Sequence, residues 1–228
     1  MTTTDAARLS RAGLARLLDH SVLKPESTAH EIVAGAEVVR AHRIGFYCVQ
    51  PTWVKLAAQS LSKRGALIVA VVGFPHGCDV PAVKARAAEL AVIDGAREVD
   101  MVINFGALIS DDMQLVETDI TSVVRAVPGI AVKVIIEAAA LDNSEKIVAC
   151  RIAVDAGAAF VKTSTGFHPS GGATVSDIRL MRKTVGPLIG VKASGGVRSL
   201  ADVQAMLAAG ANRIGTSSSA AILAALES

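Results

Sequence analysis

The sequence is poor in aromatic residues. Only 3% of its 228 residues are Phe, Trp or Tyr, although 51% are hydrophobic. A core built on aromatic side chains is therefore excluded, and Ala, Val, Ile and Leu must supply it. This composition suits parallel strands buried on both faces, with Ala-rich helices packed closely over them.

Cysteine is also scarce. Cys48, Cys78 and Cys150 are widely spaced and form no CxxC pair, which predicts neither a disulfide framework nor a zinc site and favours a reducing compartment. The histidines show no metal-ligand spacing, and no dinucleotide-binding fingerprint is present. We therefore expect no metal and no cofactor.

The chain lacks a charge excess and a long apolar run. Its 23 basic and 21 acidic residues leave a net charge of +2, so nucleic acid and anionic membranes are poor partner candidates. The longest apolar run, residues 66–74, is about half of what a membrane span needs. The first residues contain no apolar segment typical of a signal peptide. These absences predict a cytoplasmic protein.

Apolar strand patterns alternate with helical patterns along the whole chain. The expected strands cover residues 18–23, 45–50, 66–73, 98–104, 131–137, 159–163, 188–192 and 212–215. The expected helices cover residues 9–18, 28–40, 52–62, 80–94, 112–127, 143–156, 174–185, 199–209 and 218–226. This order predicts an α/β protein, a single (β/α)8 TIM barrel domain over residues 1–228 with an extra N-terminal helix. An open doubly wound sheet is the structural alternative.

Several predicted strands carry charged residues on one face only. Because alternate residues of a barrel strand point inward and outward, the fully apolar faces must meet the helices and the charged faces must meet the lumen. The lumen residues predicted in this way are Asp100, Lys133, Glu137, Lys162 and Lys192, with Asp19 as a further candidate. A structural salt-bridge network is the alternative, but buried ion pairs add little stability over apolar packing.

Two lysines at matching strand ends, Lys162 and Lys192, indicate amine chemistry. A lysine attacks a carbonyl only as a free amine, so its pKa must fall by several units from about 10.4. Burial and a second nearby ammonium both lower it, so one lysine can be the nucleophile while the other depresses its pKa. Asp100 is placed to move protons, and Lys133 with Glu137 would complete a polar relay.

Glycine and serine follow the last two predicted strands. Barrels often bind phosphate in these loops through backbone N–H groups and a helix N-terminus. The candidate phosphate contacts are Gly195, Gly196, Gly215, Ser217 and Ser218, and Cys48 on the second strand is a candidate lumen residue.

Seven stretches of the sequence resemble the deoxyribose-phosphate aldolase family. They read LDHSVLKP (18–25), GFPHG (73–77), EVDMVINFGA (98–107), KVIIE (133–137), FVKTSTGF (160–167), GVKASGGV (190–197) and RIGTSS (213–218). The resemblance implies a metal-free class I aldolase that reversibly cleaves 2-deoxy-D-ribose 5-phosphate to D-glyceraldehyde 3-phosphate and acetaldehyde. It also implies that Lys162 forms the Schiff base, that Lys192 lowers its pKa, that Asp100 relays protons, and that the protein is a cytoplasmic homodimer.

The chain departs from the family pattern at three places. Ala138 follows Glu137 where many members have threonine, and Phe167 stands where some have lysine. The last residues lack the tyrosine-bearing tail of some members. The alternatives are another Schiff-base sugar-phosphate aldolase or transaldolase, and a non-catalytic barrel that binds sugar phosphates.

Overall fold

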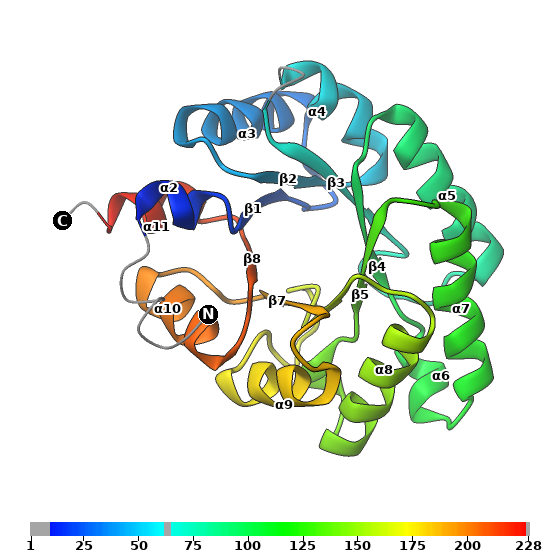
Figure 1. Cartoon of the computed structure of the whole chain (residues 1–228). Helices are drawn as coiled ribbons and strands as arrows, with labels where there is room; N and C mark the ends of the chain where they lie inside the picture. Colours follow the sequence, from blue (N-terminus) through cyan, green and yellow to red (C-terminus); the bar gives the residue numbers. More distant parts are fainter. Residues whose placement is uncertain (1–9, 62–64, 227–228) are drawn as a thin grey trace.

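Eight parallel strands close into a barrel, each hydrogen-bonded to the next and the last to the first (Figure 1). The computed structural model describes residues 10–61 and 65–226. The strands are β1 (Leu18–Val22), β2 (Phe46–Val49), β3 (Leu67–Val72), β4 (Glu98–Val102), β5 (Ala131–Ile135), β6 (Phe160–Lys162), β7 (Gly190–Ser194) and β8 (Arg213–Thr216). The predicted TIM barrel is therefore confirmed.

Helices surround the barrel on the outside (Figure 1). They are α2 (Arg11–Ala15), α3 (Ala29–His42), α4 (Val54–Ser60), α5 (Pro81–Asp94), α6 (Phe105–Ile109), α7 (Met113–Ala126), α8 (Asn143–Asp155), α9 (Val175–Val185), α10 (Leu200–Ala209) and α11 (Ser219–Ala224), with 3-10 turns η1 (Pro51–Trp53) and η2 (Ala138–Ala140). The predicted extra helix corresponds to α2, which precedes β1 and packs beside α11. The predicted helix end at residue 62 and the predicted start at Leu9 lie outside the described residues.

Short polar signals set where the helices begin. Thr28 caps α3 in a reciprocal pair with Glu31, and Ser199 caps α10 in the same way with Asp202. These capping boxes satisfy backbone N–H groups that no helical carbonyl can reach. Each such cap fixes the point at which a loop from the barrel mouth enters its helix.

Strand alternation separates two apolar regions. Val99, Met101, Val132, Val134, Val161 and Val191 belong to the large core shared with the helices. Cys48, Val69 and Val71 form a separate small cluster. The outward faces of β4 to β7 are thus apolar as predicted, and the lumen is left to a few small residues and to charged side chains.

Several predicted boundaries are wrong, among them the end of the first helix, which lies at Ala15 and not at residue 18. β4 and β5 end at Val102 and Ile135, two residues before the predicted ends, and β7 runs over Gly190–Ser194 and begins after Leu188. The short helix α6 was not predicted, because Phe105–Ile109 follows the strand directly and contains Gly106. Among the described residues, no helix is long and apolar enough to cross a membrane.

Candidate active site

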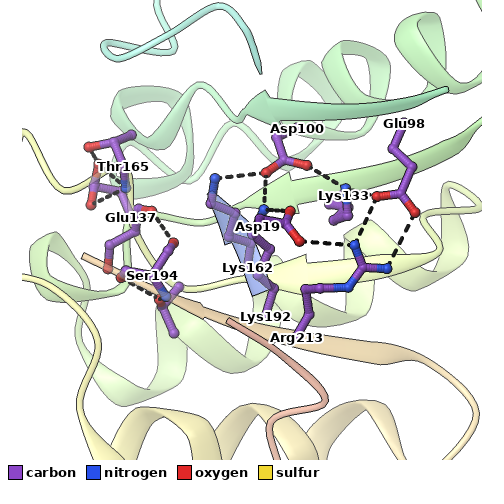
Figure 2. A network of polar contacts seen from close by, with 12 residues as sticks. Asp19, Glu98, Asp100, Lys133, Glu137, Lys162, Thr165, Lys192, Ser194 and Arg213 are labelled. Atoms are coloured by element: carbon purple, nitrogen blue, oxygen red, sulfur yellow. Dashed lines mark hydrogen bonds and ion pairs between the residues drawn. The ribbon is translucent and has the colours of Figure 1, made fainter. Parts of the chain in front are cut away.

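Seven charged side chains gather in the lumen, and each is buried. They are Asp19, Glu98, Asp100, Lys133, Lys162, Lys192 and Arg213. Figure 2 shows them joined by one continuous set of ion pairs and hydrogen bonds. These residues come from six strands, β1, β4, β5, β6, β7 and β8. The strand register explains why they lie together: Asp100 on β4 pairs with Lys133 on β5, and Lys162 on β6 pairs with Lys192 on β7.

Asp100 is the centre of the cluster. Its Oδ1 accepts a hydrogen bond from Lys133 Nζ at 2.7 Å, and its Oδ2 accepts from Lys162 Nζ and Lys192 Nζ, both at 2.8 Å. Burial alone would raise the pKa of Asp100, but the three lysines outweigh it and hold that pKa well below its usual range. Asp100 is therefore a carboxylate at neutral pH in the free protein.

The two cavity lysines differ in how many carboxylates they contact. Lys192 is bonded to Asp19 as well as to Asp100. Among the described residues, Lys162 has an ion pair with Asp100 alone. This difference in pairing gives the two amines opposite pKa shifts.

The pKa of Lys162 is lowered and that of Lys192 is raised. Burial lowers the pKa of Lys162, and the charge of Lys192 lowers it further against the opposing effect of Asp100. Burial would also lower the pKa of Lys192, but Asp100 and Asp19 outweigh it. Of the two lysines, Lys162 is therefore the one that more readily becomes a free amine.

A cavity of about 480 Å³ opens above the cluster. Asp19, Cys48, Lys162 and Lys192 line its floor. Its walls come from the loops after β1, β6, β7 and β8, at the carboxyl ends of the strands, where TIM-barrel enzymes place their active sites. Burial raises the pKa of the Cys48 thiol to about 11. The thiol therefore stays protonated at neutral pH and does not supply a thiolate nucleophile.

The loop after β7 forms one wall. Gly195 and Gly196 line the cavity and have φ angles of 85° and 79°, a region that favours glycine. A Cβ on Gly195 would also stand 3.0 Å from Gly172 Cα. Glycine at 195 therefore allows the two loops to approach each other closely, whereas a Cβ on Gly196 would meet nothing within 4 Å.

The other phosphate candidates occupy different positions. Ser217 lines the cavity, but the cavity lining does not include Ser218, whose N–H donates to Thr216 Oγ1. Gly215 lies low in the barrel, where an added Cβ would stand 3.1 Å from Lys192 Cε. Two cationic residues at the rim, Lys24 and Arg198, also line the cavity.

Glu137 does not join the lysine cluster as strand alternation predicted. Its backbone has φ 53°, so the chain turns after β5 and the alternation ends at Ile135. Its Oε2 accepts from Thr165 Oγ1 at 2.6 Å, and the Thr165 N–H points to the same carboxylate. Glu137 therefore orders the loop after β6, whereas Lys133 lies within the cluster.

Sequence reasoning missed Glu98 and Arg213. Both obey the alternation rule, because Glu98 lies two residues before Asp100 and Arg213 lies two residues before Gly215. Applying the rule to the first residue of each strand would have found them. Thr165 was also missed, and no pattern in its loop marked it as the partner of Glu137.

A closed barrel with buried lysines on the floor of an open cavity points to the class of enzymes that use a lysine amine on carbonyl substrates. The model of the DeoC/LacD family of aldolases matches residues 13–225. The chain belongs to this aldolase family, which confirms the predicted lyase and the predicted family resemblance.

Individual relatives agree. A deoxyribose-phosphate aldolase of Listeria monocytogenes is 54% identical over 211 residues, which cover 92% of this chain and 94% of that protein. One from Streptococcus gordonii is 51% identical over 210 residues, covering 92% and 95%. The tetrameric deoxyribose-phosphate aldolase of Aeropyrum pernix has a TM-score of 0.89 at 28% identity, covering 99% of this chain and 97% of that one.

Proposed function

We propose that the protein cleaves 2-deoxy-D-ribose 5-phosphate reversibly to D-glyceraldehyde 3-phosphate and acetaldehyde through a Schiff base on Lys162. One observation carries the assignment of the nucleophile: Lys162 faces the cavity and has a single carboxylate partner, whereas Lys192 has two. The identity of the substrate is supported by the names of relatives that are more than half identical to this chain.

The proposed reaction balances over the groups present. The Lys162 amine adds to the substrate aldehyde, and water leaves the carbinolamine to give an iminium ion. The iminium draws electrons from the bond between the second and third carbons, while the third-carbon hydroxyl loses its proton and becomes the aldehyde of the first product. The enamine left on Lys162 then takes a proton, and water hydrolyses the acetaldehyde iminium to restore the amine.

Asp100 is the group that we assign to these proton transfers. It is bonded to the Lys162 amine at 2.8 Å in the free enzyme. When the amine enters the carbinolamine, Asp100 loses the charge of one neighbouring ammonium, and this raises its affinity for a proton. Lys192 stays protonated beside it and stabilises negative charge that develops on oxygen.

The phosphate binds, in this proposal, against Gly195, Gly196 and Ser217. The helix after β8 has only six residues, so loop N–H groups and rim cations carry the interaction, not a helix dipole. Arg198 lines the same cavity as Phe167, which is 44% exposed, and supplies a positive charge there. No charged partner is therefore needed at residue 167.

A product assay tests the reaction. Incubation of the protein with 2-deoxy-D-ribose 5-phosphate should release acetaldehyde and D-glyceraldehyde 3-phosphate in equal amounts. A transaldolase would instead pass a ketose fragment to an aldehyde acceptor and release no acetaldehyde. A non-catalytic sugar-phosphate barrel would bind the substrate and release neither product.

We also propose a cytoplasmic homodimer that assembles through α5. Three large apolar side chains on this helix, Val83, Leu90 and Ile93, are exposed, and so is its N-cap residue Val80. Their positions are symmetric about a point between residues 86 and 87. A two-fold axis there would set Val83 against Leu90 of the partner subunit and Val80 against Ile93 of the partner subunit.

Charge on the same helix supports this arrangement. Arg86 and Glu89 form an exposed ion pair one turn apart. In an antiparallel contact around the same axis, Arg86 would lie within reach of Glu89 of the partner subunit. The face is thus complementary to itself in both apolar and charged positions.

A further inference from the structure

The ion pairs below the cavity form a closed ring. Going round it, Asp19 contacts Lys192, Lys192 contacts Asp100, and Asp100 contacts Lys133. Lys133 contacts Glu98 at 2.6 Å, Glu98 contacts Arg213 at 3.1 Å, and Arg213 returns to Asp19 at 3.0 Å. Three carboxylates and three cations alternate, and each contacts two neighbours of opposite charge.

Lys162 lies outside this ring, and among the described residues its ion pair with Asp100 is its one link to the ring. The ring itself is neutral, because its three positive charges match its three negative charges. Protonated Lys162 is therefore the surplus positive charge of the cluster. In a buried site, where charges couple strongly, the surplus proton is the one most easily lost.

Arg213 and Glu98 form the part of the ring farthest from the cavity. Each is the first residue of its strand, β8 and β4, and neither lines the cavity. The guanidinium of Arg213 is held over the rings of Phe46 at 3.3 Å and Phe160 at 5.3 Å. Its Nη1 donates to both Asp19 and Glu98, and its Nη2 donates to Glu98 at 3.3 Å.

We propose that Arg213 and Glu98 are positioning residues that close this ring and thereby leave Lys162 as the one cation of the described lumen cluster without a carboxylate of its own. This inference rests on the proposed role of Lys162 as nucleophile. Neither residue touches the substrate. They act through Asp19 and Lys192 on one side and through Lys133 and Asp100 on the other.

The groups that surround the Lys162 amine come from several strands. They are Asp100 on β4, Lys192 on β7 and Cys48 on β2, with Asp19, Glu98, Lys133 and Arg213 behind them. The Cys48 thiol is neutral at working pH. The balance between the four cations and three carboxylates therefore sets when Lys162 gives up its proton.

The test measures how readily Lys162 reacts as a free amine at each pH. Trace acetic anhydride labels the whole protein between about pH 6 and 11, and peptide mapping gives the labelling midpoint of Lys162. Arg213→Met removes one positive charge, so the ring is left with one uncompensated carboxylate charge and Lys162 should keep its proton longer. We expect the midpoint to rise by about one to two pH units.

Glu98→Gln should shift the labelling midpoint of Lys162 in the opposite direction. It adds a second surplus positive charge, and the midpoint should fall. The Glu98→Gln/Arg213→Met double variant restores the charge balance, and its midpoint should return close to that of the unaltered protein. Arg213→Lys keeps the charge and should leave the midpoint nearly unchanged.

Arg182→Met is the matched control, because Arg182 is a partly buried arginine that bonds only backbone carbonyls away from the lumen in the described residues. It should leave the midpoint unchanged. Equal midpoints in all folded variants, or shifts of the same sign for Glu98→Gln and Arg213→Met, would overturn the proposal. Because labelling needs no turnover, failure of the aldolase assay and failure of the ring are separate results.

Discussion

Lysine pairing decides the chemistry at the scale of single residues. Strand alternation predicted that Lys162 and Lys192 would meet near Asp100, because a period of two leaves only the lumen for a charged residue between apolar neighbours. Strand alternation could not predict which of the two lysines would have the fewer carboxylate partners and more readily become a free amine. That depends on Asp19, which contacts Lys192 and not Lys162 in the described structure, and long-range pairing of this kind has no local pattern.

Replacing Lys192 by leucine should shift the acid limb of the activity profile upward. The change removes the ammonium that lowers the pKa of Lys162 and leaves Asp19 and Asp100 with uncompensated charge. Since free Lys162 is the reactive form, activity rises only at higher pH. We expect kcat/KM at pH 7 to fall by about two orders of magnitude or more.

A pH profile of kcat/KM checks this prediction. Lys146→Leu is the control, since Lys146 pairs with Asp177 between α8 and α9 and should leave the limb in place. If the acid limb of the kcat/KM profile lay at the same pH in Lys192→Leu as in the unaltered protein, coupling between the two lysines would be disproved.

Arg198 should matter for phosphate and not for the aldehyde. It lines the cavity beside Gly196 and is exposed. For Arg198→Ala we expect a rise in KM for 2-deoxy-D-ribose 5-phosphate of about tenfold, the loss of one charge-assisted contact. Cleavage of 2-deoxy-D-ribose without phosphate should be unchanged, and an equal loss with both sugars would contradict the phosphate assignment.

Secondary-structure elements place these residues, and here the sequence was informative except at strand ends. Buried apolar runs and helical periodicity predicted the order of strands and helices, and the expected helices 28–40 and 199–209 begin at the observed N-caps Thr28 and Ser199. The alternation failed at Glu137 because the backbone enters the left-handed region there. In this conformation the Glu137 carboxylate contacts Thr165, a residue of the next βα loop, and no local pattern marks that contact.

A second buried ion pair fixes the element that carries Asp100. Lys84 on α5 donates to Asp119 on α7 at 2.6 Å and to the carbonyls of Gly77 and Val102. It thereby ties the loop after β3 and the end of β4 to two helices. Asp119 also accepts from the Asn104 N–H at 3.0 Å.

Lys84→Met should therefore destabilise the fold. It leaves Asp119 buried without its cation, and loss of one partner of such a pair costs about 3–5 kcal/mol. The Lys84→Met/Asp119→Leu double variant should recover much of that loss. Urea unfolding measures both, with Gln114→Ala, which loses only an exposed hydrogen bond to Thr118, as the control expected to change little. The account would be contradicted if the double variant lost as much free energy of unfolding as Lys84→Met and Asp119→Leu lose together as single variants.

The whole molecule presents its active site at one end of the barrel and an exposed apolar helix on its side. The walls of the cavity come from four βα loops and its floor from strand residues, whereas α5 lies on the outer ring of helices (Figure 1). The described cavity lining contains no residue of α5.

Leu90→Glu should convert the proposed homodimer to a monomer. The added charge would face an apolar residue of the partner subunit, where burial of an unpaired carboxylate is unfavourable. Light scattering after size exclusion should give twice the chain mass for the unaltered protein and the single mass for this variant. Leu188→Glu, at a 95% exposed position before β7, should stay dimeric. A dimer that survives Leu90→Glu would place the interface elsewhere.

Trapping of the covalent intermediate tests the central claim most directly. The protein is incubated with acetaldehyde and borohydride, which reduces an iminium to a stable secondary amine, and is then mapped by peptide mass spectrometry. The account predicts one two-carbon adduct on Lys162 and none on Lys162→Ala. An adduct on Lys192 would reverse the roles of the two lysines, and the absence of any adduct in the active protein would contradict a Schiff-base mechanism.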